Sequence, residues 1–132
     1  MTQPTIFPIV PYKDVRAAIQ WLGEAFGFTV HALHEDSDGT IVHCELALGD
    51  SGMIMPTGER GGDVRIPFNP GPTWLYVVVE DADAHHARAV AAGAEIISPL
   101  EDQDYGSRDY TAKDPGGNLW SFGTYLPGTP AA

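Results

Sequence analysis

Apolar side chains follow a helical period near the start of the chain. In residues 15–26 they recur every three or four positions, as expected for one face of a helix. These positions are Val15, Ile19, Leu22 and Phe26. Asp14 is a favoured N-cap residue before this stretch, and Gly27 stands where helices commonly end. The pattern therefore predicts a helix over residues 15–26.

Segments in which apolar residues occupy alternate positions surround this helix, and they predict strands. The expected strands of the first half are residues 5–12, 28–35, 40–48 and 53–55. The same order then begins again. The expected elements of the second half are a strand at 73–80, a helix at 82–92 capped by Asp81, and strands at 94–100, 108–113 and 118–125.

The two halves match in the order and spacing of their elements. Gly27 and Gly93, which follow the two helices, lie half of the 132-residue length apart. We therefore predict an α+β fold of two tandem βαβββ modules, each a curved mixed sheet with its helix on the outside. The two sheets would surround a cleft. The expected boundaries are module one at about 5–56, a Gly/Pro-rich linker at about 57–72, module two at about 73–125 and a tail at 126–132.

Composition narrows the classes of function. A formal net charge of −11 opposes binding to nucleic acid, because that binding depends on lysine and arginine neutralising phosphates. The first ten residues lack a basic region and a long apolar run, so neither a signal peptide nor a membrane span is expected. The single cysteine, Cys44, excludes a disulfide framework within the chain and favours a reducing compartment, the cytoplasm.

Two segments are more specific. The first module ends in LGDSGMIM, and the second ends in YGSRDYTAKDPGGNLWSFGTY, with a tight turn at Asp114–Asn118. In this paired layout the chain resembles the vicinal oxygen chelate superfamily over residues 5–125. That superfamily includes glyoxalase I, extradiol dioxygenases, fosfomycin-resistance enzymes and bleomycin-resistance binding proteins. The resemblance implies the fold directly. It does not by itself imply the function, because unrelated chemistries share this scaffold.

The enzymes of that superfamily hold a divalent metal with His and Glu side chains on four strands. Matching the turns places those positions at Phe7, Met55, Trp74 and Ser121. Two aromatic rings, a thioether and a hydroxyl are poor ligands for such an ion. The resemblance to the enzymes therefore fails at the metal, and we expect no metal, no cofactor and no catalytic residue.

The alternation of strand 118–125 places Trp120 and Phe122 beneath the helix, so that Ser121 and Gly123 line the cleft. The same phasing in the other strands gives a cleft rich in aromatic and thioether groups, which suits a planar or apolar molecule. The expected ligand-binding residues are Phe7, Ile9, His43, Glu45, Met53, Met55, Trp74, Tyr76, Ser121 and Gly123.

His43 and Glu45 lie two positions apart on one strand and share a face. They are interpreted as a polar cross-strand pair, as a polar anchor in the cleft, or as an off-pattern metal or acid/base pair. Cys44 points away from them, which opposes a Cys/His nucleophile.

The remaining histidines suggest less chemistry. His31 and His34 lie three positions apart on a strand, which predicts opposite faces and makes them poor partners for one site. His85 and His86, on the second helix, are expected to be solvated.

Together these features favour a metal-free protein that binds and sequesters a small aromatic or antibiotic-like molecule, as bleomycin-resistance proteins do. Such proteins are typically homodimers with clefts between subunits, so the resemblance implies a homodimer. The alternatives are a glyoxalase-like or dioxygenase-like enzyme with a relocated metal or none, and an accessory carrier in a biosynthetic pathway.

Overall fold

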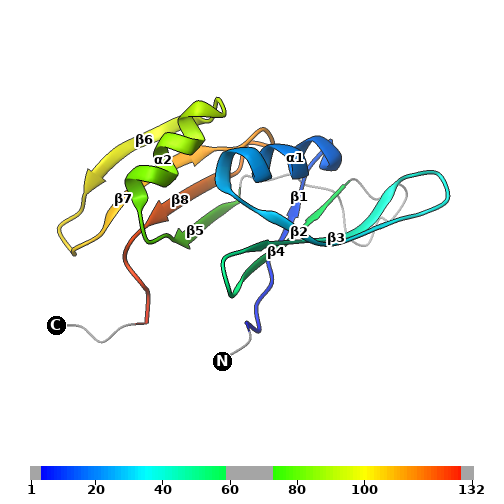
Figure 1. Cartoon of the computed structure of the whole chain (residues 1–132), viewed down its shortest axis with the longest axis horizontal. Coiled ribbons are helices and arrows are strands. Elements are labelled where there is room, and N and C mark those ends of the chain that lie inside the picture. The colour runs from blue at the N-terminus through cyan, green and yellow to red at the C-terminus, as the bar shows by residue number, and fades with distance from the viewer. Residues whose placement is uncertain (1–3, 59–72, 129–132) are drawn as a thin grey trace.

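The computed structural model describes residues 4–58 and 73–128 and contains two modules with the same order of elements (Figure 1). Module one consists of β1 (Ile9–Pro11), α1 (Val15–Phe26), β2 (Thr29–Glu35), β3 (Ile41–Leu48) and β4 (Gly52–Thr57). Module two consists of β5 (Trp74–Val78), α2 (Ala82–Ala91), β6 (Glu95–Asp102), β7 (Arg108–Lys113) and β8 (Leu119–Gly123). The predicted α+β fold of two βαβββ modules is confirmed. Residues 59–72 of the expected linker and 129–132 of the expected tail lie outside the described residues.

Each module folds into one mixed four-stranded sheet. The strand order is β1-β4-β3-β2 in the first sheet and β5-β8-β7-β6 in the second. The first strand of each module pairs in parallel with the last, and the other neighbours pair antiparallel. A parallel pair needs a crossover connection, and in each module the helix and the two strands that follow it supply this connection. Both helices lie side by side on the same side of the two sheets (Figure 1).

The helix ends follow the predicted capping pattern. The Asp14 carboxylate accepts a hydrogen bond from the Ala17 backbone N–H at 3.0 Å, and Gly27 ends α1 with a φ of 89°. A residue with a side chain would be strained at that positive φ. Asp81 caps α2 in the same way through the Ala84 backbone N–H, also at 3.0 Å.

The first strand is shorter than predicted, and prolines explain the difference. Residues 5–12 are expected to be extended, whereas β1 covers only Ile9–Pro11. Pro8 and Pro11 have no N–H to donate to a sheet. Pro8 contributes only its carbonyl, which accepts from the Met55 backbone N–H at 2.9 Å. The segment before Ile9 therefore lies outside regular pairing.

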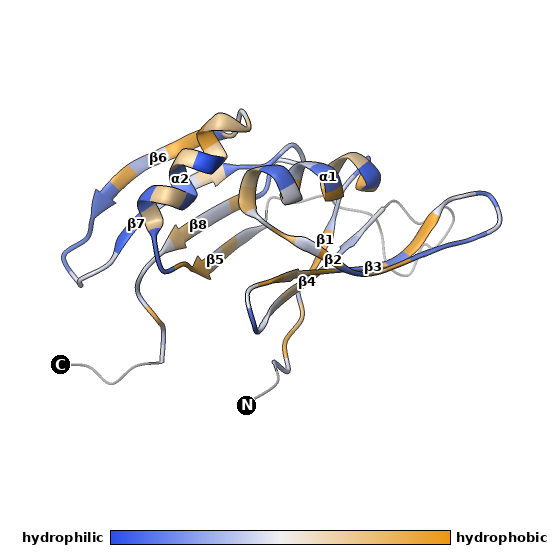
Figure 2. Cartoon of the chain, viewed as in Figure 1, coloured by the Kyte–Doolittle hydropathy of each residue, from blue (hydrophilic) through white to orange (hydrophobic). Residues whose placement is uncertain are grey.

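Alternate residues of each strand face the helices and form the core. In module two the side chains of Tyr110, Ala112, Trp120 and Phe122 are fully buried beneath α2. In module one Cys44, Leu46 and Ile54 are buried in the corresponding place. Figure 2 shows the apolar stretch along β5 and the polar turn between β2 and β3. Period-two alternation therefore leaves one face of each sheet without helix cover, and we call these the open faces.

Two side chains of α2 join the modules by hydrogen bonding to the C-terminal carbonyls of α1. Arg88 donates to the carbonyl oxygens of Gly23 and Glu24 at 2.9 and 3.0 Å, and His85 Nε2 donates to the Phe26 carbonyl at 2.9 Å. Carbonyls at a helix C-terminus have few backbone partners, so these bonds satisfy those of Glu24 and Phe26 and add to the bond that the Gly23 carbonyl accepts from the Gly27 N–H at 3.2 Å. The expectation that His85 is solvated is wrong, because its side of α2 packs against α1.

Candidate functional site

Aromatic side chains dominate the open face of module two. Trp74 is 71% exposed, Tyr76 39% and Val78 42%, while the intervening Leu75 and Val77 pack against the core. The indole Nε1 of Trp74 donates a hydrogen bond to Ser121 Oγ on the adjacent strand at 2.9 Å. This bond holds the ring in place while one of its faces stays accessible.

The small side chains of β8 accommodate these rings. A Cβ on residue 123 would lie only 2.8 Å from the Tyr76 hydroxyl oxygen, which means that Tyr76 extends over Gly123. The Tyr76 hydroxyl then donates to the Tyr125 carbonyl at 2.6 Å. Ser121 and Gly123 were expected to leave room for a ligand directly. In the single chain that space is filled by Trp74 and Tyr76, so the accessible surface consists of the rings themselves.

The open face of module one carries aliphatic and thioether groups. Ile9 is 61% exposed and is paired with Met55 in the register of β1 and β4, so the two side chains share this face. Met53 lies two positions before Met55 on the same strand. Phe7, which precedes β1, is 38% exposed. Ile9, Met53 and Met55 thus place aliphatic and thioether groups side by side on the first sheet, and Phe7 lies on the segment that leads into it.

His43 and Glu45 form a close polar pair on that same open face. His43 Nε2 lies 2.7 Å from Glu45 Oε2, and His31 Nε2 lies 3.8 Å from the other carboxylate oxygen. The hydrogen bond from His43, together with the charges of the nearby histidines, holds the pKa of Glu45 below its ordinary value. Glu45 is therefore an anionic group on the face that carries the apolar surface.

The predicted separation of His31 and His34 onto opposite faces is wrong. A β-bulge between Val30 and Ala32 interrupts the alternation of β2 at His31. Beyond the bulge, His34 lies directly opposite His43, with ring centroids 5.8 Å apart. A bulge places one extra residue against the partner strand, so three positions along the chain no longer mean opposite faces. Three histidines therefore surround Glu45.

Cys44 and the four superfamily metal positions offer little chemistry. Cys44 is buried in the core. Its burial, and to a lesser degree the charge of Glu45, raises the pKa of its thiol.

No carboxylate or imidazole stands at the four superfamily metal positions, which are Phe7, Met55, Trp74 and Ser121. Ser121 Oγ already bonds to Trp74 and Thr111. These side chains do not fit a divalent metal. Within residues 4–58 and 73–128, no three His, Cys, Asp or Glu side chains are placed to hold one.

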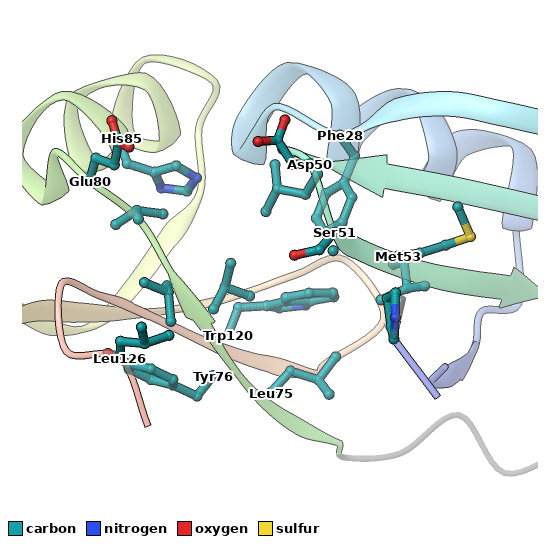
Figure 3. Close-up of a pocket in the computed structure, with 18 of the residues that line it drawn as sticks. Phe28, Asp50, Ser51, Met53, Leu75, Tyr76, Glu80, His85, Trp120 and Leu126 are labelled. Carbon is teal, nitrogen blue, oxygen red and sulfur yellow. The ribbon is translucent and has the colours of Figure 1, made fainter. Parts of the chain in front are cut away.

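A groove of about 970 Å³ lies between the two modules (Figure 3). It is bounded by β4 and the turn before it on one side and by β5 and the start of α2 on the other. Of the predicted site residues, Met53 and Tyr76 line it. A smaller pocket of about 70 Å³ includes Ile9, His43 and Met55. The other predicted residues, which line neither cavity, are Phe7, Glu45, Trp74, Ser121 and Gly123.

The groove also contains polar residues that sequence reasoning missed. Asp50 and Ser51 reach it from the β3–β4 turn, and Glu80 and His85 reach it from the start of α2 (Figure 3). Desolvation lowers the pKa of His85, although the Phe26 carbonyl partly opposes this effect. No local pattern marked these residues, because the groove exists only where the two modules meet.

The described residues contain no helix that is long and apolar enough to cross a lipid bilayer.

The family model for the "Glyoxalase/Bleomycin resistance protein/Dioxygenase superfamily" matches residues 5–122. Among solved structures, TioX from Micromonospora sp. ML1 is 34% identical, with a TM-score of 0.77, and the match covers 92% of this chain and 99% of that one.

Two further relatives show the range of similarity. TnmS3, described as an antibiotic binding protein from Streptomyces sp. CB03234, is 21% identical with a TM-score of 0.69, covering 92% of this chain and 97% of that chain. This likeness shows a shared fold. The uncharacterized protein Mb0911c of Mycobacterium bovis is 29% identical over 126 residues, which span 92% of this chain and 83% of the relative.

Proposed function

The chain belongs to the glyoxalase/bleomycin resistance protein/dioxygenase superfamily, and on that basis we propose that it binds and sequesters a small aromatic, antibiotic-like molecule without transforming it. The relative TnmS3 is described as an antibiotic binding protein, which supports this class of ligand. The proposed site comprises the open faces of the two sheets. Its expected contacts are Phe7, Ile9, His43, Glu45, Met53, Met55, Trp74 and Tyr76, while Ser121 and Gly123 support the rings of Trp74 and Tyr76 that lie over them.

The observation that carries the proposal is the exposed and immobilised ring of Trp74. A large aromatic side chain that is 71% exposed is unusual in a folded domain, and the bond to Ser121 fixes its orientation. A planar ligand that stacks on it gains about 0.5–1.5 kcal/mol beyond the burial of apolar area. Burying about 300 Å² of apolar surface adds about 7 kcal/mol, from which association costs of at least ~4 kcal/mol are subtracted. About 3 kcal/mol remains, so two or three stacking contacts of this size contribute materially to the affinity.

The side chains at the metal positions favour binding over metal-dependent catalysis. Phe7, Met55, Trp74 and Ser121 supply apolar surface where the superfamily's enzymes supply ligands. We therefore propose that the protein uses no metal or other cofactor. Glyoxalase-like or dioxygenase-like chemistry would need a relocated metal, and the cluster around Glu45 is the first place to look for it.

The pair of His43 and Glu45 provides a polar contact beside this apolar surface. With the pKa of Glu45 lowered, its carboxylate accepts hydrogen bonds from a hydroxyl or amine of the ligand. The neighbouring imidazoles add groups that can donate or accept. A ligand with an apolar body and a polar edge matches this arrangement.

We also propose that a second copy of the chain completes the cleft. Within one chain the modules join through α1 and α2, and β1 and β5 are not paired with each other in the described sheets. Trp74 and Ile9 thus remain exposed on separate open faces. If the open faces of two protomers packed against each other, Trp74 and Ile9 would both lie inside the cleft between them.

The cysteine content supports a cytoplasmic location for this binding. The single Cys44 is buried and free, which is consistent with action in the reducing cytoplasm.

The direct test is a binding titration with analysis of the ligand afterwards. Planar antibiotics and a glycopeptide such as bleomycin are added to the protein while tryptophan fluorescence is followed. We expect saturable quenching and recovery of the ligand with unchanged mass. Conversion of the ligand during prolonged incubation would instead establish an enzyme. The binding test does not distinguish resistance by sequestration from carriage in a biosynthetic pathway, because both roles require binding. The genes next to the one that encodes this protein would distinguish the two roles.

A further inference from the structure

Asp109 carries a carboxylate whose charge has no cationic partner in the part of the chain that the structure describes. It lies on the open face of β7, directly opposite Gly123 of β8. Its two oxygens accept hydrogen bonds from Gln103 Nε2 at 3.0 Å and from the Tyr105 hydroxyl at 3.1 Å. Both donors are neutral. A carboxylate has room for about four hydrogen bonds, so part of its capacity remains free.

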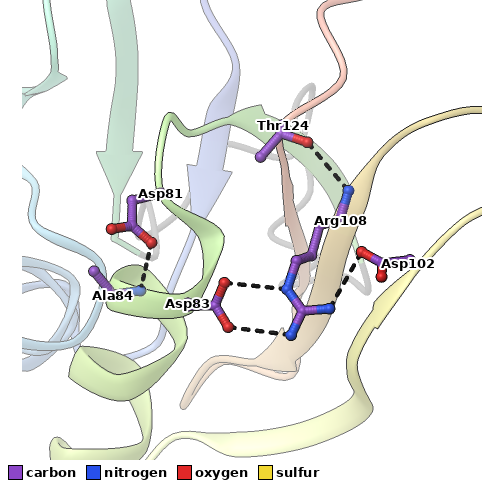
Figure 4. A network of polar contacts seen from close by, with 6 residues as sticks. All are labelled: Asp81, Asp83, Ala84, Asp102, Arg108 and Thr124. Atoms are coloured by element: carbon purple, nitrogen blue, oxygen red, sulfur yellow. Dashed lines mark hydrogen bonds and ion pairs between the residues drawn. The ribbon is translucent and has the colours of Figure 1, made fainter.

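The neighbouring residue shows the contrast. Arg108, on the opposite face of β7, donates through Nε and Nη2 to both oxygens of Asp83 at 3.1 Å and through Nη1 to Asp102 at 3.2 Å (Figure 4). The only cation next to Asp109 in sequence is thus committed to two other carboxylates. Arg108 thus neutralises Asp83 of α2 and Asp102 of β6, whereas Asp109, on the open face of β7, has no counter-charge among the described residues.

Three tyrosines lie around this carboxylate. Tyr105 and Tyr125 meet edge to face with ring centroids 5.6 Å apart, and the Tyr76 hydroxyl donates to the Tyr125 carbonyl. A Cβ on residue 123 would lie 2.8 Å from both the Tyr76 hydroxyl and the Asp109 Cβ, so these two groups flank the same glycine. Tyr76, Tyr105 and Tyr125 are 39%, 61% and 38% exposed, which leaves their rings accessible.

The field of Asp109 reaches two of these phenols. Desolvation, then the hydrogen bond and the charge of Asp109, raises the pKa of Tyr105. Desolvation also raises the pKa of Tyr76, with a contribution from the Asp109 charge. A carboxylate beside aromatic rings attracts cations in two ways, by direct charge and through the negative faces of the rings. The net charge of −11 adds attraction at longer range.

We propose that Asp109, Tyr76, Tyr105 and Tyr125 bind a cationic nitrogen, such as a protonated amine or a quaternary ammonium group, on the ligand. The proposal rests on the proposed function for the aromatic part of the ligand. Trp74 and Tyr76 alternate on β5 and lie about 7 Å apart along the strand. A planar ring system on Trp74 therefore places a basic substituent at Asp109 when the two are separated by a short linker. The expected ligand class is a planar aromatic compound with a cationic side group.

A matched pair of probes tests the charge. Calorimetric titrations compare (2-naphthylmethyl)trimethylammonium with its neutral carbon isostere, 2-neopentylnaphthalene, in the same cosolvent. We expect the wild-type protein to bind the ammonium probe about tenfold more tightly, which corresponds to about 1.4 kcal/mol. In NMR spectra the N-methyl protons should shift upfield, because they lie over ring faces.

Variants then locate the cation. Asp109→Asn should remove the tenfold preference while leaving the affinity for the neutral probe within about twofold. Asp38→Asn removes the same charge in the turn between β2 and β3, at the opposite end of the molecule (Figure 1), and should leave the preference intact. Tyr105→Phe keeps the ring but loses the bond to Asp109, and it should retain the preference. Thermal melts establish that each variant is folded.

The outcomes separate this proposal from the proposed function. If the neutral probe binds through Trp74 and the ammonium probe has no advantage, the cation site is wrong and the aromatic site stands. If the ammonium probe depends on Asp109 but not on Trp74, the cation site stands and the aromatic site fails. If Asp109→Asn weakens both probes equally, Asp109 only positions Tyr105, and the proposal is overturned. If neither probe binds, both proposals fall together.

Discussion

Tyr12 donates its hydroxyl to Asp114 Oδ2 at 2.6 Å, although the two residues lie 102 positions apart. Both side chains are buried, with Tyr12 just after β1 and Asp114 in the turn before β8. Trp120 Nε1 donates to the same oxygen at 2.9 Å, and the backbone N–H groups of Gly116 and Asn118 donate to Oδ1. Asp114 is thus a buried carboxylate satisfied by donors from both modules.

This arrangement predicts a stability cost when the Tyr12 hydroxyl is removed. Burial, then the charge and hydrogen bond of Asp114, raises the pKa of Tyr12 far above its ordinary value, so the phenol stays a donor. Tyr12→Phe should lower the free energy of unfolding by about 1.5–3 kcal/mol, the range for a hydrogen bond to a charged group. Urea denaturation measures it. Tyr125→Phe, at a ring that is 38% exposed, should change stability by less than about 0.5 kcal/mol, and an equal loss in both variants would contradict the interpretation.

His85 predicts how stability depends on pH. Its Nε2 donates to the Phe26 carbonyl while Nδ1 faces the Tyr110 hydroxyl at 2.6 Å, an arrangement that suits the neutral ring. Desolvation lowers the pKa of His85 below the ordinary 6.5, and the charge of Arg88 adds to this effect. As the pH falls, His85 therefore takes up a proton in the unfolded chain at a higher pH than in the folded chain. Stability from this group is complete above about pH 6.5 and falls as the pH drops toward the lower folded pKa.

The measurement compares the free energy of unfolding at pH 7.5 and pH 5.5. His85→Gln should lose less stability over this interval than the wild-type protein, because its contribution to the acid sensitivity is gone. His86→Gln, one position along the same helix, is the matched control and should behave like the wild type. Acid sensitivity that is unchanged in His85→Gln would show that other groups cause it.

Local patterns predicted the features that depend on neighbours in sequence. The caps at Asp14 and Gly27 and the alternation that buries Trp120 depend on a few adjacent residues, and the structure has them where expected. The bulge at His31 reverses an alternation through pairing with β3, and no residue type in β2 announces it. The position of His85 likewise depends on how α2 packs against α1.

For the candidate site, too, local patterns predicted which face a side chain lies on but not which side chains it contacts. Alternation placed Trp74 and Ser121 on one face, but only the register of β5 and β8 shows that the indole bonds to the hydroxyl. Asp109 was not predicted as a site residue, because no local pattern around it points to a binding group. β7 sends Arg108 and Asp109 to opposite faces, and Arg108 pairs with Asp83 and Asp102, which leaves Asp109 without a cationic partner among the residues that the structure describes.

The absence of ligand side chains at the four superfamily positions predicts the metal content of the protein. Purified and dialysed protein should contain no stoichiometric Zn²⁺, Ni²⁺, Mn²⁺ or Fe²⁺ by elemental analysis. Addition of EDTA should leave both ligand affinity and thermal stability unchanged. One metal ion per chain would overturn the metal-free proposal, and loss of that ion in Glu45→Gln would locate it at the histidine cluster.

The two separate open faces predict a dimer. Light scattering at micromolar concentration should give about twice the chain mass of 14.2 kDa. Ile9→Glu places a charge on the exposed apolar face of module one and should shift the species toward monomer, whereas Val90→Glu, on an exposed position of α2, should not. A wild-type monomer would mean that ligand binds to the open faces or the groove of a single chain.

The two tryptophans of the paired strands predict opposite effects on binding and stability. Trp74 is 71% exposed, whereas Trp120 is fully buried among Phe26, Phe28 and Phe122. Trp74→Ala should weaken binding of a planar antibiotic by about 1–3 kcal/mol, roughly five- to 150-fold, and change stability little. Trp120→Ala should cost about 3–5 kcal/mol of stability, because it opens a cavity and removes the donor that Trp120 Nε1 supplies to Asp114 Oδ2.

Calorimetric titration and urea denaturation of both variants give the comparison, with Trp74→Phe as the control that keeps an aromatic face but loses the bond to Ser121. Trp74→Phe should retain most of the affinity if stacking dominates. If its affinity falls as far as that of Trp74→Ala, the indole N–H and the orientation it sets matter more than the ring surface. If Trp74→Ala binds as the wild type does, the ligand does not occupy the open face of β5, and the groove that Met53 and Tyr76 line becomes the site to test.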